Sequence, residues 1–207
     1  MPNLKNCTIP ESRYHYLKQY SDLYKTAVVK PEKLNEINKI IEKIISLKPR
    51  YEKLNLNIPW WVIGIIHYME SNFDLKRHLH NGDLLIARTV KAPAGRPKVG
   101  NPPFTWEESA VDALLDRCWY GDNLEQILYF FEAYNGFGYR NKKVNSPYLW
   151  SYTNHYTGGK FVEKKDPRTG TYKSFFDTSV SSKQAGACAI IKTMESLKLI
   201  ENIKKMY

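Results

Sequence analysis

Glu70 is the carboxylate whose place in the sequence best suits acid catalysis. Pro59 can open a helix, and the next seven residues, Trp60 to Ile66, are all apolar or glycine, which predicts a helix buried on every side. Glu70 follows Ile63 by seven positions, or two helical turns, so it lies on the same inward stripe. Burial raises the pKa of a carboxyl group, which can then hold a proton near neutral pH, as a general acid for glycosidic cleavage must. The alternative is a helix-end glutamate paired with a lysine or arginine.

A glycosidase commonly needs a second carboxylate, which acts as a nucleophile or as a base through a water molecule. Asp83 is one candidate because it ends the polar run Asn81-Gly82-Asp83, although such a run is also ordinary turn chemistry. Glu132 is another because it shares a predicted helix with Tyr134 and can support a cleft, but it can equally be a structural or solvated residue. The sequence leaves the second group open.

Several aromatic side chains are candidates for contact with the acid or with sugar. Tyr134 follows Ile127 and Phe131 at helical spacing, which directs its ring toward the core and its hydroxyl toward Glu70. A core tyrosine with a different hydrogen-bond partner is the alternative. Flat rings can also stack on sugars, and four of them lie in or beside predicted loops: Trp106, Tyr139, Tyr148 and Trp150.

The histidines do not predict a metal site. His67, His78 and His80 could be combined with Glu70, but the His-Glu-x-x-His zinc motif is absent, and a lone histidine on an apolar helix face is more often a hydrogen-bonded core residue. Neither of the common glycine-rich phosphate-binding motifs is present. We therefore expect no metal and no cofactor.

The elements that must position these residues are mainly helices. Apolar residues at helical spacing predict an amphipathic helix after Pro31 and a shorter, outer helix before it. Their stripes are Leu34, Ile37, Ile41, Ile44 and Ile45 in the first, and Tyr14, Leu17, Tyr20 and Tyr24 in the second.

Local signals mark where the later elements begin and end. Capping boxes predict helix starts at Thr105 with Glu108 and at Asp122 with Glu125, and Gly136 ends the second of these helices. A third box, Ser181 with Gln184, precedes a last helix that begins with small residues, so Gln184 has either a capping role or a cleft role. Residues 160–162 and 172–176 flank the turn sequence DPRTG and predict a small β-hairpin, whereas residues 75–104 predict a long irregular loop.

The composition is that of a folded protein of one domain. The chain has 207 residues, of which 43% are hydrophobic and 14% aromatic, and no stretch is apolar enough to span a membrane. The N-terminal residues have no apolar signal-peptide core, so we expect synthesis in the cytoplasm. The three cysteines, Cys7, Cys118 and Cys188, are far apart and odd in number, which predicts buried free thiols and no disulfide framework.

Positive charge gathers at the two ends of the chain. The net charge is +5 over residues 1–58, −3 over residues 59–139 and +8 over residues 140–207. This pattern suits attraction to an anionic partner by the flanks, or it is simply a soluble surface. In the predicted C-terminal helix, Lys192, Lys198, Lys204 and Lys205 accompany apolar residues, so this basic amphipathic helix can adsorb to an anionic outer envelope or pack on the domain.

The order of several segments resembles the lysozyme superfamily, particularly goose-type lysozymes, lytic transglycosylases and single-domain phage peptidoglycan muramidases. The similar segments are RYEKLNLNIPWWVIGIIHYMES, HLHNGD, ARTVKAPAGRP, PPFTWEESAVDAL, EAYNGFGYR, SPYLWS and KQAGA. By this resemblance Glu70 is the catalytic acid of a Glu-Ser pair with Ser71, Tyr134 orients the acid, and Asn135 contacts sugar. Related muramidases often lack an obvious catalytic aspartate, so Glu70 can act with a positioned water alone. Leu84 and Phe161 depart from the usual proline and tyrosine, which affects only local loop shape.

These observations predict a mainly α, lysozyme-like domain with long irregular loops, at residues 50–207, and an N-terminal helical extension, residues 1–49, packed on it. The resemblance implies a monomeric muramidase that cleaves the β-1,4 bond between N-acetylmuramic acid and N-acetylglucosamine. A phage endolysin that reaches the wall through a membrane pore is the expected setting. The site is expected to use Glu70 with support from Ser71, Asn81, Asp83, Glu132, Tyr134, Asn135, Tyr139, Tyr148, Trp150 and Gln184. The alternatives are a lytic transglycosylase and a non-catalytic wall-binding module; no nucleic-acid motif favours a nucleic-acid partner.

Overall fold

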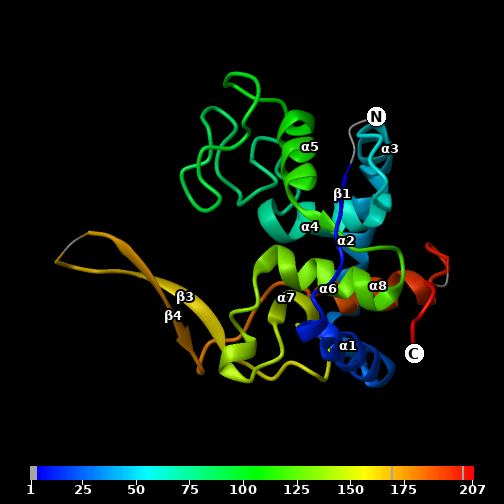
Figure 1. The fold of residues 1–207 in the computed structure, drawn as a ribbon. Coiled ribbons are helices and arrows are strands. Elements are labelled where there is room, and N and C mark those ends of the chain that lie inside the picture. The colour runs from blue at the N-terminus through cyan, green and yellow to red at the C-terminus, as the bar shows by residue number, and fades with distance from the viewer. Residues whose placement is uncertain (1–3, 169, 202) are drawn as a thin grey trace.

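The computed structural model describes residues 4–168, 170–201 and 203–207, and within them the protein is mainly α-helical (Figure 1). This confirms the predicted fold class at the level of secondary structure. The α-helices are α1 (Tyr14–Thr26), α2 (Leu34–Ser46), α3 (Lys48–Lys53), α4 (Trp60–Ser71), α5 (Trp106–Asp116), α6 (Leu124–Asn135), α7 (Pro147–Trp150) and α8 (Ala187–Ser196). Short 3-10 helices span Glu11–Arg13, Pro31–Lys33 and Arg140–Lys142. No helix of the described residues has the length and apolarity needed to cross a membrane.

Helix α4 is the central helix, as its apolar sequence predicts. Every residue from Trp61 to Tyr68 is buried. A Cβ atom added at Gly64 would lie 2.6 Å from Ile44 Cγ2, so the absence of a side chain there allows α2 to pack closely on α4. The helix ends at Asn72, which has the left-handed φ of 50° that often terminates a helix.

The first 49 residues contribute to the same core as the rest of the chain. Helix α1 packs on α6, and α2 packs on α4 and α8. Tyr20, Ile37, Ile41 and Ile44 are buried in one continuous hydrophobic cluster with α4. The predicted stripe of α2 is correct at its centre, but Leu34 and Ile45 at its ends are exposed. The N-terminal helices are therefore part of one packed unit.

The predicted hairpin is confirmed, and it projects from the helical body as an arm (Figure 1). Strand β3 (Lys160–Lys165) pairs antiparallel with β4 (Tyr172–Asp177), with Phe161 opposite Phe176. Tyr139 holds the base of the arm, because its ring packs on Phe161 and its hydroxyl accepts a hydrogen bond from the Phe161 amide at 3.2 Å.

The prediction of three free cysteines is wrong. Strand β1 (Lys5–Asn6) pairs in parallel with β2 (Cys118–Trp119). This pairing brings Cys7 beside Cys118, and the two form a disulfide with their Cα atoms 5.4 Å apart. Spacing in the sequence could not reveal the bond because 111 residues separate the partners. Cys188 is a buried free thiol, as predicted.

Two of the three predicted capping boxes are wrong. Thr105 and Glu108 form the predicted reciprocal box at the start of α5. Helix α6 is capped by Asn123, whose side chain accepts from the Gln126 amide, and not by Asp122. At α8 the N-cap is Gly186 and makes no side-chain cap.

The predicted C-terminal helix is also shorter than expected. Helix α8 ends at Ser196, so Lys198, Lys204 and Lys205 lie beyond it and do not form a basic helical face. The small residues before it do permit close packing, because a Cβ at Gly186 would lie 2.5 Å from the carbonyl oxygen of Leu149 in α7.

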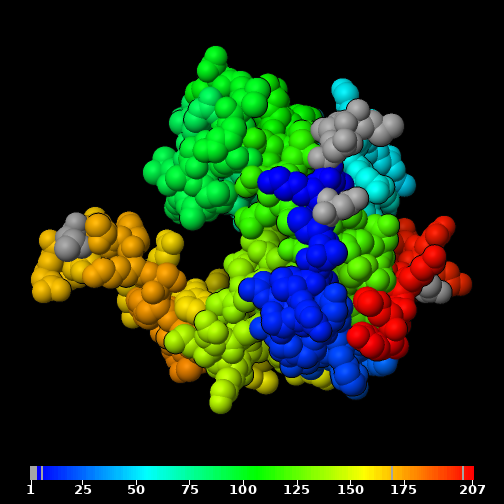
Figure 2. Space-filling view, in the orientation of Figure 1, coloured from blue at the N-terminus to red at the C-terminus, as the bar shows by residue number. Residues whose placement is uncertain are grey.

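Residues 75–104 form the predicted irregular segment, which with α5 builds a separate loop lobe. Figure 2 shows an open hollow between this lobe and the hairpin arm. The C-terminal end of α4 is directed toward this side of the molecule (Figure 1). The last turn of α4, which carries Glu70, is therefore where a site at the hollow would be built.

Candidate active site

Glu70 lies in the last turn of α4 and is only partly exposed. The Tyr148 hydroxyl, from α7, donates a hydrogen bond to Glu70 Oε1 at 2.8 Å. Desolvation raises the pKa of Glu70 to about 7, while the Tyr148 hydrogen bond and the positive charge of Arg117 oppose that rise. Near neutral pH both the protonated and the ionised form are therefore populated, as acid catalysis requires.

Tyr148 is the tyrosine that contacts the acid, and Tyr134 is not. The Tyr134 hydroxyl donates to the carbonyl oxygen of Leu79 at 2.7 Å, and its buried ring lies under the Arg117 guanidinium, 4.6 Å from the ring centroid. The prediction that Tyr134 hydrogen-bonds Glu70 is therefore wrong, and the alternative of a core tyrosine with its own partner holds. Tyr148 was expected only as one of several aromatic residues that can stack on sugar.

Gln184 supports the end of α4 from behind. Its Nε2 atom donates to the carbonyl oxygens of Met69 at 2.9 Å and Tyr68 at 3.3 Å. The last carbonyls of a helix commonly lack partners within it, and here the Tyr68 carbonyl also accepts from the Asn72 amide at 2.9 Å. The next residue, Ala185, donates its amide to the Tyr68 hydroxyl at 3.0 Å. Gln184 thus positions the turn that carries Glu70 and does not cap α8.

Asp83 lies near the end of α4, but its carboxylate accepts hydrogen bonds from groups of its own loop. Its Oδ2 atom accepts from the amides of Val90 at 2.8 Å and Lys91 at 3.0 Å, and from Asn81 Nδ2 at 3.2 Å. Desolvation would raise the pKa of Asp83, but these hydrogen bonds outweigh it and lower the pKa below its ordinary value. Asp83 is therefore an ionised carboxylate that orders residues 81–91.

The neighbouring glycine brings this loop against the helix that carries the acid. A Cβ at Gly82 would lie 2.7 Å from the backbone oxygen of Glu70, and its φ of 76° is in the region that favours glycine. Asn81 is also committed to the loop, because its amide nitrogen donates to the Lys91 carbonyl at 3.0 Å and its Oδ1 accepts from the Asp83 amide at 3.0 Å. These contacts hold the loop that carries Asp83 against the last turn of α4.

Glu132 is a structural residue of the core, as one of its two predicted interpretations held. Its buried Oε2 atom accepts from the Tyr20 hydroxyl at 2.5 Å and from Arg140 Nη2 at 2.6 Å. The Arg140 guanidinium also lies 3.5 Å from the centroid of the Tyr16 ring. These partners join α6 to α1 and to the residues that follow α6.

The other expected site residues are distributed around the fold. Ser71 Oγ donates to the His67 carbonyl at 3.1 Å within α4, and Asn135 is exposed at the end of α6. Trp150 and Trp106 are buried, so they are unavailable for stacking on sugar in this conformation. Tyr139 is also buried and serves the hairpin base.

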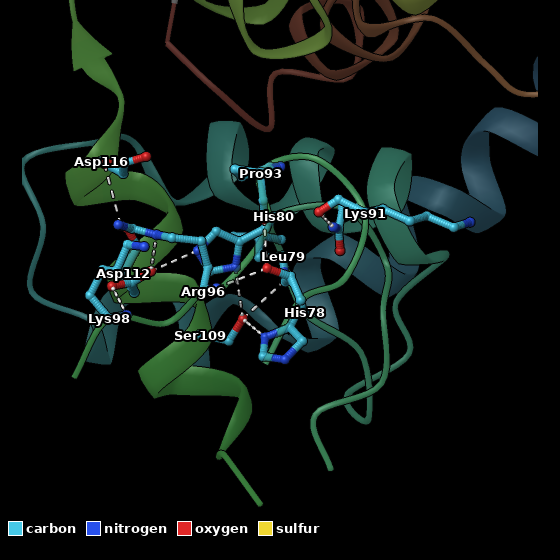
Figure 3. A network of polar contacts seen from close by, with 12 residues as sticks. His78, Leu79, His80, Lys91, Pro93, Arg96, Lys98, Ser109, Asp112 and Asp116 are labelled. Carbon is cyan, nitrogen blue, oxygen red and sulfur yellow. Dashed lines mark hydrogen bonds and ion pairs between the residues drawn. The ribbon is translucent and has the colours of Figure 1, made fainter. Parts of the chain in front are cut away.

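His78 and His80 take part in a polar network that supports the loop lobe (Figure 3), whereas His67 is buried in the core with its Nδ1 atom 3.1 Å from the Tyr51 hydroxyl. Ser109 Oγ lies 2.9 Å from His78 Nδ1 and 3.4 Å from His80 Nδ1, and it accepts from the Leu79 amide at 3.2 Å. His80 Nε2 lies 2.8 Å from Asp112 Oδ2, which also pairs with Arg96 at 2.8 Å.

This network holds a serine, a histidine and an aspartate in contact, but it is structural. Ser109 is fully buried, so a substrate cannot reach its hydroxyl. Burial lowers the pKa of His80 to about 4 against the opposing effect of Asp112, which keeps the ring neutral near pH 7. This polar network and the hydrogen bond from the Tyr134 hydroxyl to the Leu79 carbonyl together fix residues 78–80 beside the end of α4. The described residues contain no group of three side chains placed to hold a metal ion.

Arg117 is a residue near the acid that sequence reasoning missed. It follows α5 directly and precedes Cys118, so strand β2 and the disulfide hold its backbone. Its charge lowers the pKa of Glu70 against desolvation. No sequence motif marks this arginine, since its effect on Glu70 depends on the tertiary fold, in which its guanidinium lies over the Tyr134 ring of α6.

Comparison with known proteins adds no relative: no family model matches the chain, and neither a curated protein nor a solved structure matches it.

Proposed function

We propose that the chain is a lysozyme-like peptidoglycan muramidase in which Glu70 is the general acid. The observation that carries this proposal is the desolvated Glu70 carboxyl at the end of a buried helix, with its pKa raised to about 7 and its orientation set by Tyr148. The resemblance of the surrounding segments to phage muramidases agrees with it. The substrate is the β-1,4 bond between N-acetylmuramic acid and N-acetylglucosamine.

Glu70 protonates the leaving oxygen, and Tyr148 makes that transfer easier. When Glu70 gives up its proton it becomes a carboxylate, and the Tyr148 hydroxyl is placed to donate to that charge. A hydrogen bond to an ionised acceptor is roughly twice as strong as one between neutral groups, so it stabilises the acid most when proton transfer has occurred. An interaction that strengthens in the transition state raises turnover.

Glu70 acts without a second carboxylate in this proposal. The proposal gives neither Asp83 nor Glu132 a role as nucleophile or base, because Asp83 Oδ2 accepts hydrogen bonds from its own loop and the buried Glu132 pairs with Arg140. The Glu70 carboxylate formed in the first step then accepts a proton from a water molecule, whose oxygen bonds to the sugar carbon, and Glu70 returns to its protonated form. A single acidic group is equally suited to a lytic transglycosylase, in which the muramic acid 6-hydroxyl attacks, and this is the second candidate.

Digestion of purified sacculi followed by mass spectrometry tests both candidates. We expect products that end in reducing muramic acid, and we expect Glu70→Gln to abolish them while the protein stays folded. Products lighter by one water would assign the chain to the transglycosylases. Sedimentation with sacculi without any soluble product from the wild type would leave only a wall-binding module.

A phage endolysin made in the host cytoplasm is the proposed setting, and the disulfide agrees with it. Disulfides persist in oxidising compartments and are rare in the cytosol, so the Cys7–Cys118 bond suits a protein that acts after release through a membrane pore. The proposed enzyme acts as a monomer and needs no metal or cofactor.

The basic C-terminal residues are proposed to help adsorption to an anionic envelope. Lys198, Lys204 and Lys205 are exposed beyond α8. Replacing all three with Gln should weaken sedimentation with whole sacculi at about 20 mM salt and have little effect at about 200 mM, because salt screens exposed charges. Equal binding of the two proteins at both salt concentrations would show that these lysines have no part in targeting.

A further inference from the structure

A lysine-lined pocket of about 540 Å³ lies at the C-terminal end of α4, where Tyr68 and Asn72 contribute to its lining. Its size falls in the usual range for small-ligand sites. The pocket is bounded by α2, by the end of α4 and by the segment that precedes α8. The lining residues used below are Lys39, Lys43, Tyr68, Asn72, Lys183 and Gln184.

The three lysines give the pocket a positive charge that the described residues leave uncompensated. Lys39 and Lys43 lie four apart on α2, where like charges repel. None of the three lysines belongs to any ion pair of the described residues. Glu36 is the one acid in the lining, and it already accepts from the Tyr152 hydroxyl at 2.8 Å and pairs with Lys33. The pocket is therefore suited to an anionic ligand.

The pocket also carries groups that recognise more than charge. Tyr68 is buried and presents part of an aromatic wall, and Asn72 is exposed at the end of α4. Gln184 links the pocket to the candidate active site, because its amide holds the carbonyls of the turn that contains Glu70. An aromatic wall beside an amide and three ammonium groups suits a peptide with several carboxylates better than a free inorganic ion.

The pocket and Glu70 share the C-terminal end of α4. Tyr68 lies two residues before Glu70 in α4, which places it on the opposite side of the helix, and Asn72 is the C-cap that follows the last turn. A helix with its side chains is about 10–12 Å across. An extended peptide covers about 3.3–3.6 Å per residue, so a stem that passes over the C-terminal end of α4 needs at least three or four residues to cross that width.

We propose that this pocket binds the carboxylates of the peptide stem that is attached to the sugar held at Glu70. The proposal rests on the proposed function, because it takes the substrate to be peptidoglycan. It adds a preference for glycan strands whose stems have three or more residues and retain free carboxylates. It also assigns the N-terminal helix α2 a part in substrate binding.

Direct binding to the full chain tests the proposal without using catalysis. The probe is the N-acetylated tripeptide L-alanyl-γ-D-glutamyl-meso-diaminopimelic acid, followed by amide chemical shifts and by calorimetry. We expect shifts at Asn72 and Gln184, and at least about tenfold weaker binding to K39Q/K43Q/K183Q, because three surface charge pairs each contribute modestly. The matched control K25Q/K53Q/K165Q removes three exposed lysines elsewhere and should bind like the wild type.

Two further binding measurements identify the chemistry of the ligand. The same tripeptide with its carboxylates converted to carboxamides should lose binding. Inorganic phosphate should bind more weakly than the tripeptide, and equal affinity would overturn the peptide assignment in favour of a general anion site. Equal tripeptide binding by the wild type and K39Q/K43Q/K183Q would overturn the pocket itself.

Activity on two substrates separates this inference from the proposed function. K39Q/K43Q/K183Q should raise KM for stem-bearing glycan by several fold and leave cleavage of peptide-free glycan unchanged. If the wild type cleaves neither substrate, the proposed function fails, and the binding measurements still decide whether the pocket takes the peptide. If the wild type is active and the variant has an unchanged KM on both, the inference alone fails.

Discussion

Tyr148→Phe should move the titration of Glu70 to higher pH. The hydroxyl of Tyr148 donates to Glu70 Oε1 at 2.8 Å and stabilises the ionised form. Hydrogen bonds to charged groups contribute about 1.5–3 kcal/mol, and about 1.4 kcal/mol corresponds to one pH unit. Because solvent reaches part of Glu70, we take the lower end and expect the pKa of Glu70 to rise from about 7 by roughly one pH unit.

Two measurements follow this change. The side-chain carbon signal of Glu70 reports its protonation directly in a pH titration by NMR. The rate of muropeptide release reports it through catalysis, because the acid must be protonated to act. For Tyr148→Phe the alkaline limb of the pH profile should move up by about one unit, while turnover at the optimum falls about tenfold, because the new carboxylate loses a donor.

Tyr134→Phe is the matched control. It also removes one buried tyrosine hydroxyl near Glu70, but that hydroxyl donates to the Leu79 carbonyl. We expect an unchanged Glu70 titration and a loss of about 1–3 kcal/mol in the free energy of unfolding, because a buried carbonyl is left without its donor. If Tyr148→Phe titrates like the wild type, or if Tyr134→Phe shifts Glu70 as much, the assigned role of Tyr148 is incorrect.

Three further predictions concern stability. Glu70 binds its proton more tightly in the folded state, so the free energy of unfolding of the wild type should fall as pH rises from about 4.5 through 7. In urea denaturation, Glu70→Gln should be about 1–3 kcal/mol more stable than the wild type at pH 8 and similar to it at pH 4. Cys7→Ser should lower the free energy of unfolding by about 2–5 kcal/mol, since the disulfide closes a long loop, and a thiol reductant should reproduce this loss in the wild type but not in the variant. Arg140→Met should lower the free energy of unfolding by about 3–5 kcal/mol, because it leaves the buried Glu132 carboxylate without its cation, and adding Glu132→Gln should recover part of that loss. If the losses of the two single variants simply add in the double variant, the ion pair is contradicted.

The position of the candidate acid was predictable because it follows from local pattern. A helix that is apolar on every side, as the run from Trp60 to Ile66 is, must be buried at the centre of the fold. Helical spacing then puts Glu70 at the partly buried end of the same helix. The Thr105 capping box and the hairpin around residues 160–177 were predictable for the same reason, since each depends on residues close together in the chain.

What surrounds the acid was decided by tertiary packing. Tyr134 and Tyr148 are both buried near Glu70, and helical spacing favoured Tyr134 as the hydrogen-bond partner of the acid. The structure gives that role to Tyr148, because the packing of the helices decides which acceptor each hydroxyl reaches. Gln184 had a plausible local role as a helix cap, yet its side-chain amide donates to the carbonyls of Met69 and Tyr68, which lie 115 and 116 positions earlier in the chain.

The cysteines and the carboxylates show the same division. Cys7 and Cys118 meet because a short N-terminal strand pairs with the segment after α5, and no local signal encodes that pairing. Asp83 and Glu132 could each have been a second catalytic group until their partners were known. The sequence by itself determined the central buried helix and the residue at its end, because hydrophobic periodicity acts over a few turns. Only the tertiary structure decided which groups touch that residue, because those contacts join segments that are far apart in the chain and depend on the packing of whole helices.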